Sequence, residues 1–164
     1  FEDIQNVLRR ESVARGSLKI EVTESLVMQS PERARQVLER FKDLGIGIAC
    51  DDFGTGHSSL SNLRKMPFDT IKIDKSFIAA DAEDERAQTI LDAIVGMGSS
   101  LGLAVVAEGI ETAAQADYLR SIGCEAAQGY YYARPLPADE FYHWCSQWTP
   151  RLPSTPATES VNGA

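Results

Sequence analysis

The chain alternates short runs rich in Ile, Val and Ala with longer stretches whose apolar residues recur at helical spacing. Short runs of β-branched residues are typical of buried strands, whereas the longer spacing is typical of helices that bury one face. We therefore expect strands over residues 18–23, 46–50, 70–74, 103–107 and 126–130.

Helix-boundary signals separate these runs. Ser30 and Pro31 predict a helix start, because serine caps a first turn and proline fits its first position. Gly45 predicts the end of that helix, and Thr112 with Gln115 predicts a capping box at the start of a later one. Further helices are predicted near 59–65, over 87–101 and around the stripe formed by Phe141, Trp144, Cys145 and Trp148.

This strand–helix alternation predicts an α/β fold with a parallel sheet and helices outside it. Five units fit either an open doubly wound sheet or part of a (β/α)8 TIM-like barrel, which takes about 250 residues when complete. Periodicity does not choose between the two. We expect one domain over 1–148 and a disordered tail over 149–164, where Pro, Ser, Thr and Gly follow one another without periodicity.

Polar side chains stand near the carboxyl end of every predicted strand. One acid at a strand end is usually a helix cap, but the same pattern on five strands favours a site, because active sites of parallel α/β folds assemble at that edge. The residues concerned are Glu21, Glu24, Asp51, Asp52, Lys72, Asp74, Glu108, Glu111 and Gln128.

The chemistry of this set is that of hard oxygen donors. Carboxylates favour Mg²⁺ or Mn²⁺, and the adjacent Asp51 and Asp52 point in different directions, so that one could bridge two ions. Two such ions are the usual arrangement for hydrolysis of a phosphodiester. Lys72 adds a cation for developing charge; the plainer interpretation is a salt bridge with Asp74, two residues along the same face. Neither His57 nor His143 has zinc-site spacing.

Charge and cysteine content limit the partners and the cellular location that we expect for the protein. The net charge of −8 argues against a partner such as a nucleic acid polymer, although bound cations would let acidic groups receive a small anion. No apolar run is long enough to span a membrane, and no membrane contact is expected from this segment. Three widely spaced cysteines, Cys50, Cys124 and Cys145, predict reduced and mostly buried thiols in a cytoplasmic protein. Because residue 1 is Phe, we expect the chain to be cut from a longer one.

Five segments of the chain stand in a fixed order and at fixed separations. The segments are Glu21-Val22-Thr23-Glu24-Ser25, Asp51-Asp52-Phe53-Gly54-Thr55-Gly56, Ile71-Lys72-Ile73-Asp74, Ala107-Glu108-Gly109-Ile110-Glu111 and Gln128-Gly129-Tyr130. In order and separation they resemble the EAL-domain family of cyclic di-GMP phosphodiesterases. The resemblance covers nearly all of 1–148 and corresponds to about the C-terminal two thirds of such a barrel domain.

The resemblance implies a bacterial signalling enzyme that opens cyclic di-GMP to linear pGpG with two Mg²⁺ or Mn²⁺ ions. It implies Glu21 and Asp51 as ligands of one ion, and Asp51, Asp52 and Glu108 as ligands of the other. It implies that Lys72 contacts the attacking water, that Asp74 and Gln128 support substrate binding, and that Glu24 and Glu111 stabilise loops. The resemblance also implies a homodimer formed through the loop after Asp52 and an upstream sensor or GGDEF-type domain. The chain is then expected to be the cytosolic part of a larger membrane or sensor protein.

The Glu-Ala-Leu tripeptide that names the family does not occur in the chain, nor does an early Asn ligand. Both are expected to belong to strands that precede Phe1. This leaves an alternative open, namely a catalytically inactive domain that binds cyclic di-GMP without cutting it. A third hypothesis is a different barrel enzyme in which Lys72 forms a Schiff base or abstracts a proton.

Overall fold

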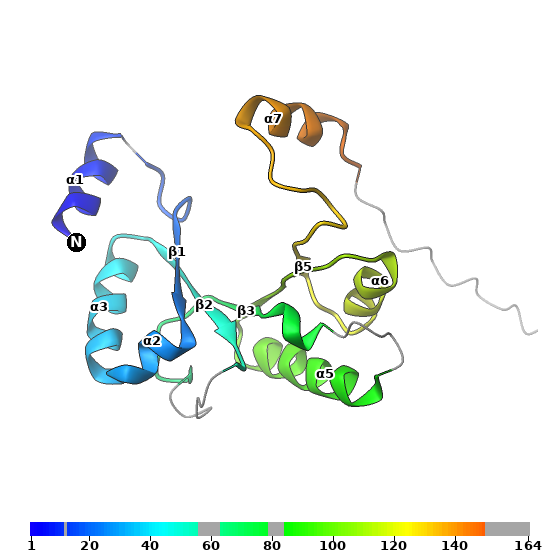
Figure 1. The fold of residues 1–164 in the computed structure, drawn as a ribbon. Coiled ribbons are helices and arrows are strands. Elements are labelled where there is room, and N and C mark those ends of the chain that lie inside the picture. The colour runs from blue at the N-terminus through cyan, green and yellow to red at the C-terminus, as the bar shows by residue number, and fades with distance from the viewer. Residues whose placement is uncertain (12, 56–62, 79–83, 150–164) are drawn as a thin grey trace, which may run out of the picture. The chain divides into compact units, whose positions relative to one another are not determined.

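The computed structural model describes residues 1–11, 13–55, 63–78 and 84–149 (Figure 1). The chain divides into two compact units, Phe1–Arg134 and Pro135–Ala164. The elements of the first unit are α1 (Glu2–Arg10), β1 (Lys19–Thr23), α2 (Glu24–Gln29), α3 (Pro31–Asp43), β2 (Gly47–Phe53), β3 (Thr70–Ile73), the 3₁₀ helix η1 (Lys75–Phe77), α5 (Glu85–Ser100), β4 (Ala104–Ala107), α6 (Ala113–Ser121) and β5 (Ala126–Ala127); the second contains α7 (Ala138–Gln147).

The five strands of the sheet are parallel and lie in chain order, β1-β2-β3-β4-β5. Figure 1 shows β1, β2, β3 and β5 following one another across the sheet. A doubly wound sheet would reverse its strand order at a switch point, whereas a barrel adds each new strand beside the previous one. The strand order therefore decides between the two predicted architectures, and the expected incomplete (β/α)8-type barrel of five βα units is confirmed.

The core lies between the middle strands and the helices that connect them. All four residues of β3 are buried, with Ile71 and Ile73 fully enclosed, and Ile48 of β2 is equally enclosed. Leu38 of α3 and Leu91 of α5 pack into the same cluster. Burial of these aliphatic side chains, at about 25 cal/mol per Å² of apolar surface, holds the carboxyl ends of the strands in fixed relative positions.

Several predicted helix boundaries are confirmed. Helix α3 has Ser30 before it and Pro31 as its first residue, although the Ser30 side chain makes no capping hydrogen bond. Gly45 after the helix takes a left-handed φ of +78°. At α6, the amide of Gln115 donates to Thr112 Oγ1 over 3.2 Å, and the amide of Thr112 donates to Gln115 Oε1 over 3.0 Å. The reciprocal bonds form the predicted capping box.

Other elements differ from the predictions. Helices α1 and α2 were not predicted, β2 continues beyond Cys50 to Phe53, and β5 has two residues instead of five. The β5 ladder ends early because the chain turns at Gly129, whose carbonyl accepts the amide of Tyr132 over 3.0 Å. Most of the helix predicted near 59–65, and all but the first residue of the predicted tail over 149–164, lie outside the described residues.

The cysteines are free, as predicted, but they are not mostly buried. Cys50 is buried, Cys124 is half-buried and Cys145 is exposed on α7. Burial raises the pKa of the Cys50 thiol to about 12. In the described part of the chain, no helix combines the length and the apolar character that a membrane crossing needs.

Candidate functional site

Four neighbouring strands each bring one charged side chain to a single cluster. Nζ of Lys72, on β3, lies 2.6 Å from Glu21 Oε2 of β1. The same nitrogen lies 3.0 Å from Asp51 Oδ1 of β2 and 2.7 Å from Glu108 Oε1, which follows β4. The parallel pairing produces this meeting, because it carries the carboxyl ends of all four strands to the same edge of the sheet.

Lys72 is the most enclosed member of the cluster. Its side chain is 9% exposed, against 18% for Glu108 and 48% for Glu21. Burial acts to lower the pKa of Lys72, but the bonds to Glu108 and Glu21 outweigh it, so the pKa is raised. The lysine is therefore an ammonium ion that offsets one of three nearby negative charges.

One oxygen of this cluster is buried and paired with the lysine. Asp51 Oδ1 lies 3.0 Å from Lys72 Nζ, which offsets its charge, and it accepts no further hydrogen bond from the described residues. A buried carboxylate is either paired with an opposite charge or bound to a metal, and here the pairing is with the lysine. The chemistry of Asp51, and that of Glu21 and Glu108 beside it, fits a hard divalent cation.

Within the described residues, no three His, Cys, Asp or Glu side chains converge into a ready metal-binding group. The ammonium of Lys72 stands between Glu21, Asp51 and Glu108 and holds these carboxylates around itself. The oxygen donors that a cation needs are thus gathered at one edge of the sheet, in an arrangement centred on lysine.

Asp52 stands on an irregularity of β2. The register of β2 against β3 shifts between Cys50 and Phe53, and Asp52 has a φ of +53°. A bulge of this kind changes the direction of the side chain that follows, so Asp51 and Asp52 leave the strand differently. Among its described neighbours, Lys72 forms ion pairs with Glu21, Asp51 and Glu108, so Asp52 lies outside that cluster.

The loop after Asp52 is held by a buried carboxylate. Glu24, at the start of α2, is 1% exposed, and its Oε2 accepts the amide hydrogen of Gly54 over 2.8 Å. This is the contact that a loop-stabilising role requires. The loop continues into 56–62, which lies outside the described residues together with His57 and the predicted dimer surface.

Gln128, after β5, joins the cluster through Glu108. Its side-chain Nε2 donates to Glu108 Oε1 over 2.6 Å, while its backbone N–H donates to Ala107 O over 2.8 Å. All five strands therefore contribute to one connected group of polar side chains.

Asp74 and Glu111 have other surroundings. Asp74 Oδ1 accepts the amide of Ser76 over 2.9 Å, and the hydrogen bonds from Ser76 lower the pKa of Asp74. The proposed salt bridge between Lys72 and Asp74 is wrong, because β3 ends at Ile73 and Asp74 caps η1. The Glu111 side chain is exposed ahead of α6.

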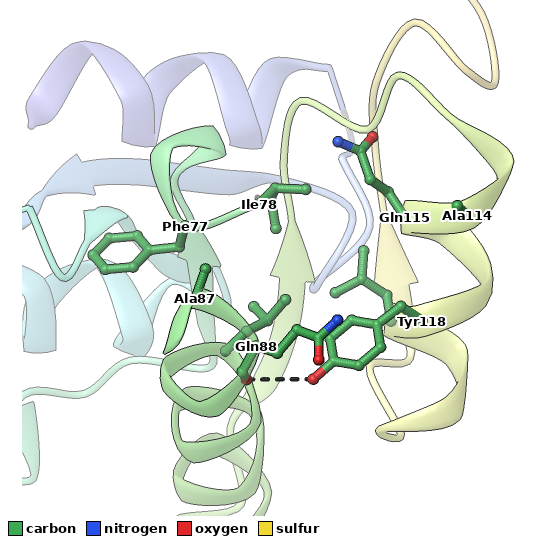
Figure 2. Close-up of a pocket in the computed structure, with 9 residues that line it drawn as sticks. Phe77, Ile78, Ala87, Gln88, Ala114, Gln115 and Tyr118 are labelled. Atoms are coloured by element: carbon green, nitrogen blue, oxygen red, sulfur yellow. Dashed lines mark hydrogen bonds between the residues drawn. The ribbon is translucent and has the colours of Figure 1, made fainter. Parts of the chain in front are cut away.

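A small apolar pocket is lined by none of the cluster residues (Figure 2). It holds about 40 Å³ between η1, α5 and α6 and is lined by residues such as Phe77, Leu91 and Tyr118, none of which belongs to the Lys72 cluster. Figure 2 shows the Tyr118 hydroxyl, which donates to Gln88 O over 3.3 Å, at one side. The volume suits a few water molecules, which is far less than a dinucleotide needs.

Comparison with known proteins adds an independent line of evidence. The bifunctional diguanylate cyclase/cyclic di-GMP phosphodiesterase MucR of Pseudomonas aeruginosa is 42% identical over 139 residues, which cover 85% of this chain and 20% of MucR. The solved complex of the PaMucR phosphodiesterase with c-di-GMP superimposes with a TM-score of 0.81 at 41% identity, covering 85% of this chain and 57% of that chain.

A second solved complex, of Klebsiella pneumoniae BlrP1 with manganese and cy-diGMP, has a TM-score of 0.73 at 33% identity and covers 82% of this chain and 34% of that chain. The chain thus spans about a fifth of the curated relative and just over half of the more similar solved chain. The family model of the EAL domain matches residues 1–135. The chain belongs to the EAL domain family.

Proposed function

We propose that this chain carries a metal-dependent phosphodiesterase activity that hydrolyses cyclic di-GMP to linear pGpG. The observation that carries the proposal is the convergence of Glu21, Asp51 and Glu108 on Lys72 at the carboxyl edge of a parallel sheet. The similarity to the PaMucR phosphodiesterase in complex with c-di-GMP supports the choice of substrate.

Two divalent cations, Mg²⁺ or Mn²⁺, belong to this proposal. Glu21 and Asp51 would hold one ion, and Asp51, Asp52 and Glu108 would hold the other. The support is the set of oxygen donors, which includes the buried Asp51 Oδ1, and the manganese complex of BlrP1. When bound, such ions lower the pKa of a coordinated water and offset negative charge on the phosphate.

Lys72 has a distinct part in this activity. Its ammonium, enclosed at 9% exposure, can donate a hydrogen bond that orients the attacking water or stabilises the charge of the phosphate in the transition state. Gln128 fixes the Glu108 carboxylate by the 2.6 Å bond to its Oε1. A Schiff-base reaction would need a neutral amine, which three carboxylates around Lys72 oppose.

The same proposal includes a cytoplasmic location, which the free thiols support, a homodimer formed through the loop after Asp52, and an upstream sensor or GGDEF-type domain. MucR supports the presence of the further domain, because it is named as a bifunctional diguanylate cyclase and cyclic di-GMP phosphodiesterase and the chain spans only 20% of its length.

The test is cyclic di-GMP turnover by the full chain with Mg²⁺ or Mn²⁺, compared with Asp51→Asn. We expect Asp51→Asn to lower kcat at least about 100-fold, the scale seen when one group that stabilises developing charge is removed. Asp3→Asn, which changes an exposed carboxylate on α1, is the matched control and keeps full activity.

Binding of cyclic di-GMP without turnover by the unmodified protein would reject the proposed activity and leave the inactive binding domain. Equal turnover by Asp51→Asn and Asp3→Asn would show that the cluster is not the catalytic site. Removal of the metal with EDTA is expected to abolish turnover in every variant.

A further inference from the structure

The 3₁₀ helix η1 lies against two glycines that each follow one of the proposed metal ligands. Gly54 comes two residues after Asp52, and Gly109 comes directly after Glu108. Side chains of η1 approach both, so this single turn contacts two segments that start from different strands.

The first contact is between Phe77 and Gly54. A Cβ placed on Gly54 would lie 2.8 Å from Cζ and 2.9 Å from Cε2 of the Phe77 ring. The ring therefore rests directly on the Gly54 backbone, at a distance that leaves no room for a methyl group. In Figure 2 the Phe77 ring points away from Gln115 and Tyr118, although the residue lines the pocket beside them.

The second contact is between Lys75 and Gly109. A Cβ on Gly109 would lie 2.5 Å from Lys75 Cβ and 3.5 Å from Lys75 Cα. The contact is made by Cβ of Lys75, which moves with the backbone, so the contact depends on the position of the η1 backbone. A displacement of η1 would therefore be felt at both glycines.

The turn itself is fixed by short-range hydrogen bonds. Asp74 Oδ1 accepts the amide of Ser76 over 2.9 Å, and Asp74 O accepts the amide of Phe77 over 3.0 Å. Ile78, which ends the turn, is buried in the core. The Asp74 cap at one end and the burial of Ile78 at the other hold this turn in place.

We propose that η1 is a spacer that sets the relative positions of Asp52 and Glu108, with Phe77 as a positioning residue. This inference rests on the proposed function, because it concerns the two carboxylates assigned there to the second cation. Asp74 contributes to this spacing through its capping of η1.

The need for a spacer follows from the conformation of Asp52. A φ of +53° costs energy for a residue other than glycine, and such a conformation persists only where its surroundings hold it. Glu24 holds the Gly54 amide from one side over 2.8 Å, and Phe77 blocks the Gly54 Cα from another. Both contacts restrain Gly54, which is two residues after Asp52.

The experiment compares Phe77→Ala and Phe77→Leu with unmodified protein in the full chain. Phe41→Ala is the matched control, because Phe41 on α3 is also partly buried against the core, where its ring packs on Phe1, while the atoms nearest to the Gly54 Cβ position all belong to Phe77. Hydrogen exchange of the segment 52–55 is measured by mass spectrometry without metal. Mn²⁺ stoichiometry and affinity are measured by calorimetry, and kcat and KM for cyclic di-GMP follow.

We expect Phe77→Ala to speed hydrogen exchange of the Gly54 amide. It should also lower the affinity for one of two Mn²⁺ ions about 10-fold or more, the range seen when a group that orients a metal ligand is removed. The affinity for the other ion changes little, and the loss of activity appears in kcat more than in KM. Phe77→Leu should have values between those of Phe77→Ala and the unmodified protein. If circular dichroism shows that Phe77→Ala does not fold, the test rests on Phe77→Leu.

If the unmodified protein binds no Mn²⁺ and leaves cyclic di-GMP intact, the proposed function fails and takes this inference with it. If the unmodified protein is active while both Phe77 variants match Phe41→Ala in exchange and in Mn²⁺ affinity, the spacer role alone is overturned.

Discussion

Lys72 supplies positive charge to the three carboxylates that surround it in this protein. Its Nζ lies within 3.0 Å of Glu21, Asp51 and Glu108. Without it, three carboxylates at the end of neighbouring strands would repel one another in a partly enclosed space. The lysine therefore keeps the acidic cluster together in the absence of divalent cations, in addition to any part in catalysis.

A Lys72→Met variant tests this stabilising role. We expect the free energy of unfolding in EDTA to fall by about 2 kcal/mol, less than for a fully buried pair because Glu21 is half exposed. Mn²⁺ should then raise the Tm of the variant by more than it raises that of the unmodified protein, since the ion replaces the lost charge. Thermal unfolding with and without Mn²⁺ measures both effects.

The matched control is Lys65→Met, which removes an exposed lysine from the segment before β3. It should leave both Tm values nearly unchanged. An equal response to Mn²⁺ in Lys72→Met and Lys65→Met would contradict the idea that Lys72 substitutes for a cation.

At the level of single residues, the sequence predicted which side chains stand at the carboxyl edge but not which of them touch. The pattern located Glu21, Asp51, Lys72 and Glu108 at strand ends, and the structure brings them together. It did not predict that Asp74 caps η1 instead of pairing with Lys72, because two residues share a face only while the strand continues. Hydrophobic periodicity in the sequence does not predict the contact between Phe77 and Gly54.

At the level of elements, α5 packs closely on the sheet through Gly98. A Cβ at this position would lie 2.4 Å from Val105 Cγ2 on β4 and 3.1 Å from Ile71 Cδ1 on β3. The missing side chain lets the helix approach the two strands that carry Lys72 and Glu108 to the site. Helix position and site geometry are therefore linked by one buried glycine.

Gly98→Ala should destabilise the fold, and Gly96→Ala should not. The methyl group at 98 overfills a packed interface, so we expect the free energy of unfolding to fall by about 2 kcal/mol. Gly96 lies on the exposed side of the same helix with open space around its Cα, so alanine there should stabilise by about 0.5 to 1 kcal/mol. Urea unfolding of both variants measures the difference, and equal effects would refute the packing argument.

Elements with explicit boundary residues were the predictable ones. The capping box of Thr112 and Gln115 and the Gly45 stop are local signals, and the structure confirms them. Helix α2 and the turn η1 are too short for helical periodicity to appear, so their presence had to come from the structure. The bulge in β2 is likewise visible only in its pairing with β3, where the register shifts between Cys50 and Phe53.

At the level of the whole molecule, β2, β3 and β4 have neighbours on both sides, whereas β1 and β5 are the outer strands of the described sheet. Strands paired on both sides open least often. In hydrogen exchange on the chain, amides of β3 should therefore exchange most slowly and those of β5 fastest among the strands. Faster exchange in β3 than in β1 or β5 would contradict the strand order.

The alternation of strands and helices predicted the βα units and their number, but the order of the strands could not be derived from it. Singly wound and doubly wound sheets are built from the same units with the same periodicity. The difference lies in where each new strand docks, which depends on side-chain packing between distant segments. The structure supplies that information by pairing β1 with β2 and β4 with β5.

The sequential strand order also bears on how the chain acquires its structure. Each strand pairs with the next one along the chain, as Lys19 does with Gly47 and Thr70 with Ala104. Contacts between segments that are close in sequence have a lower loop-closure cost and favour faster folding than contacts between remote segments. Assembly is therefore expected to proceed unit by unit during synthesis, each βα unit docking on the one made before it, so that the carboxyl edge of the sheet is completed progressively as the strands emerge.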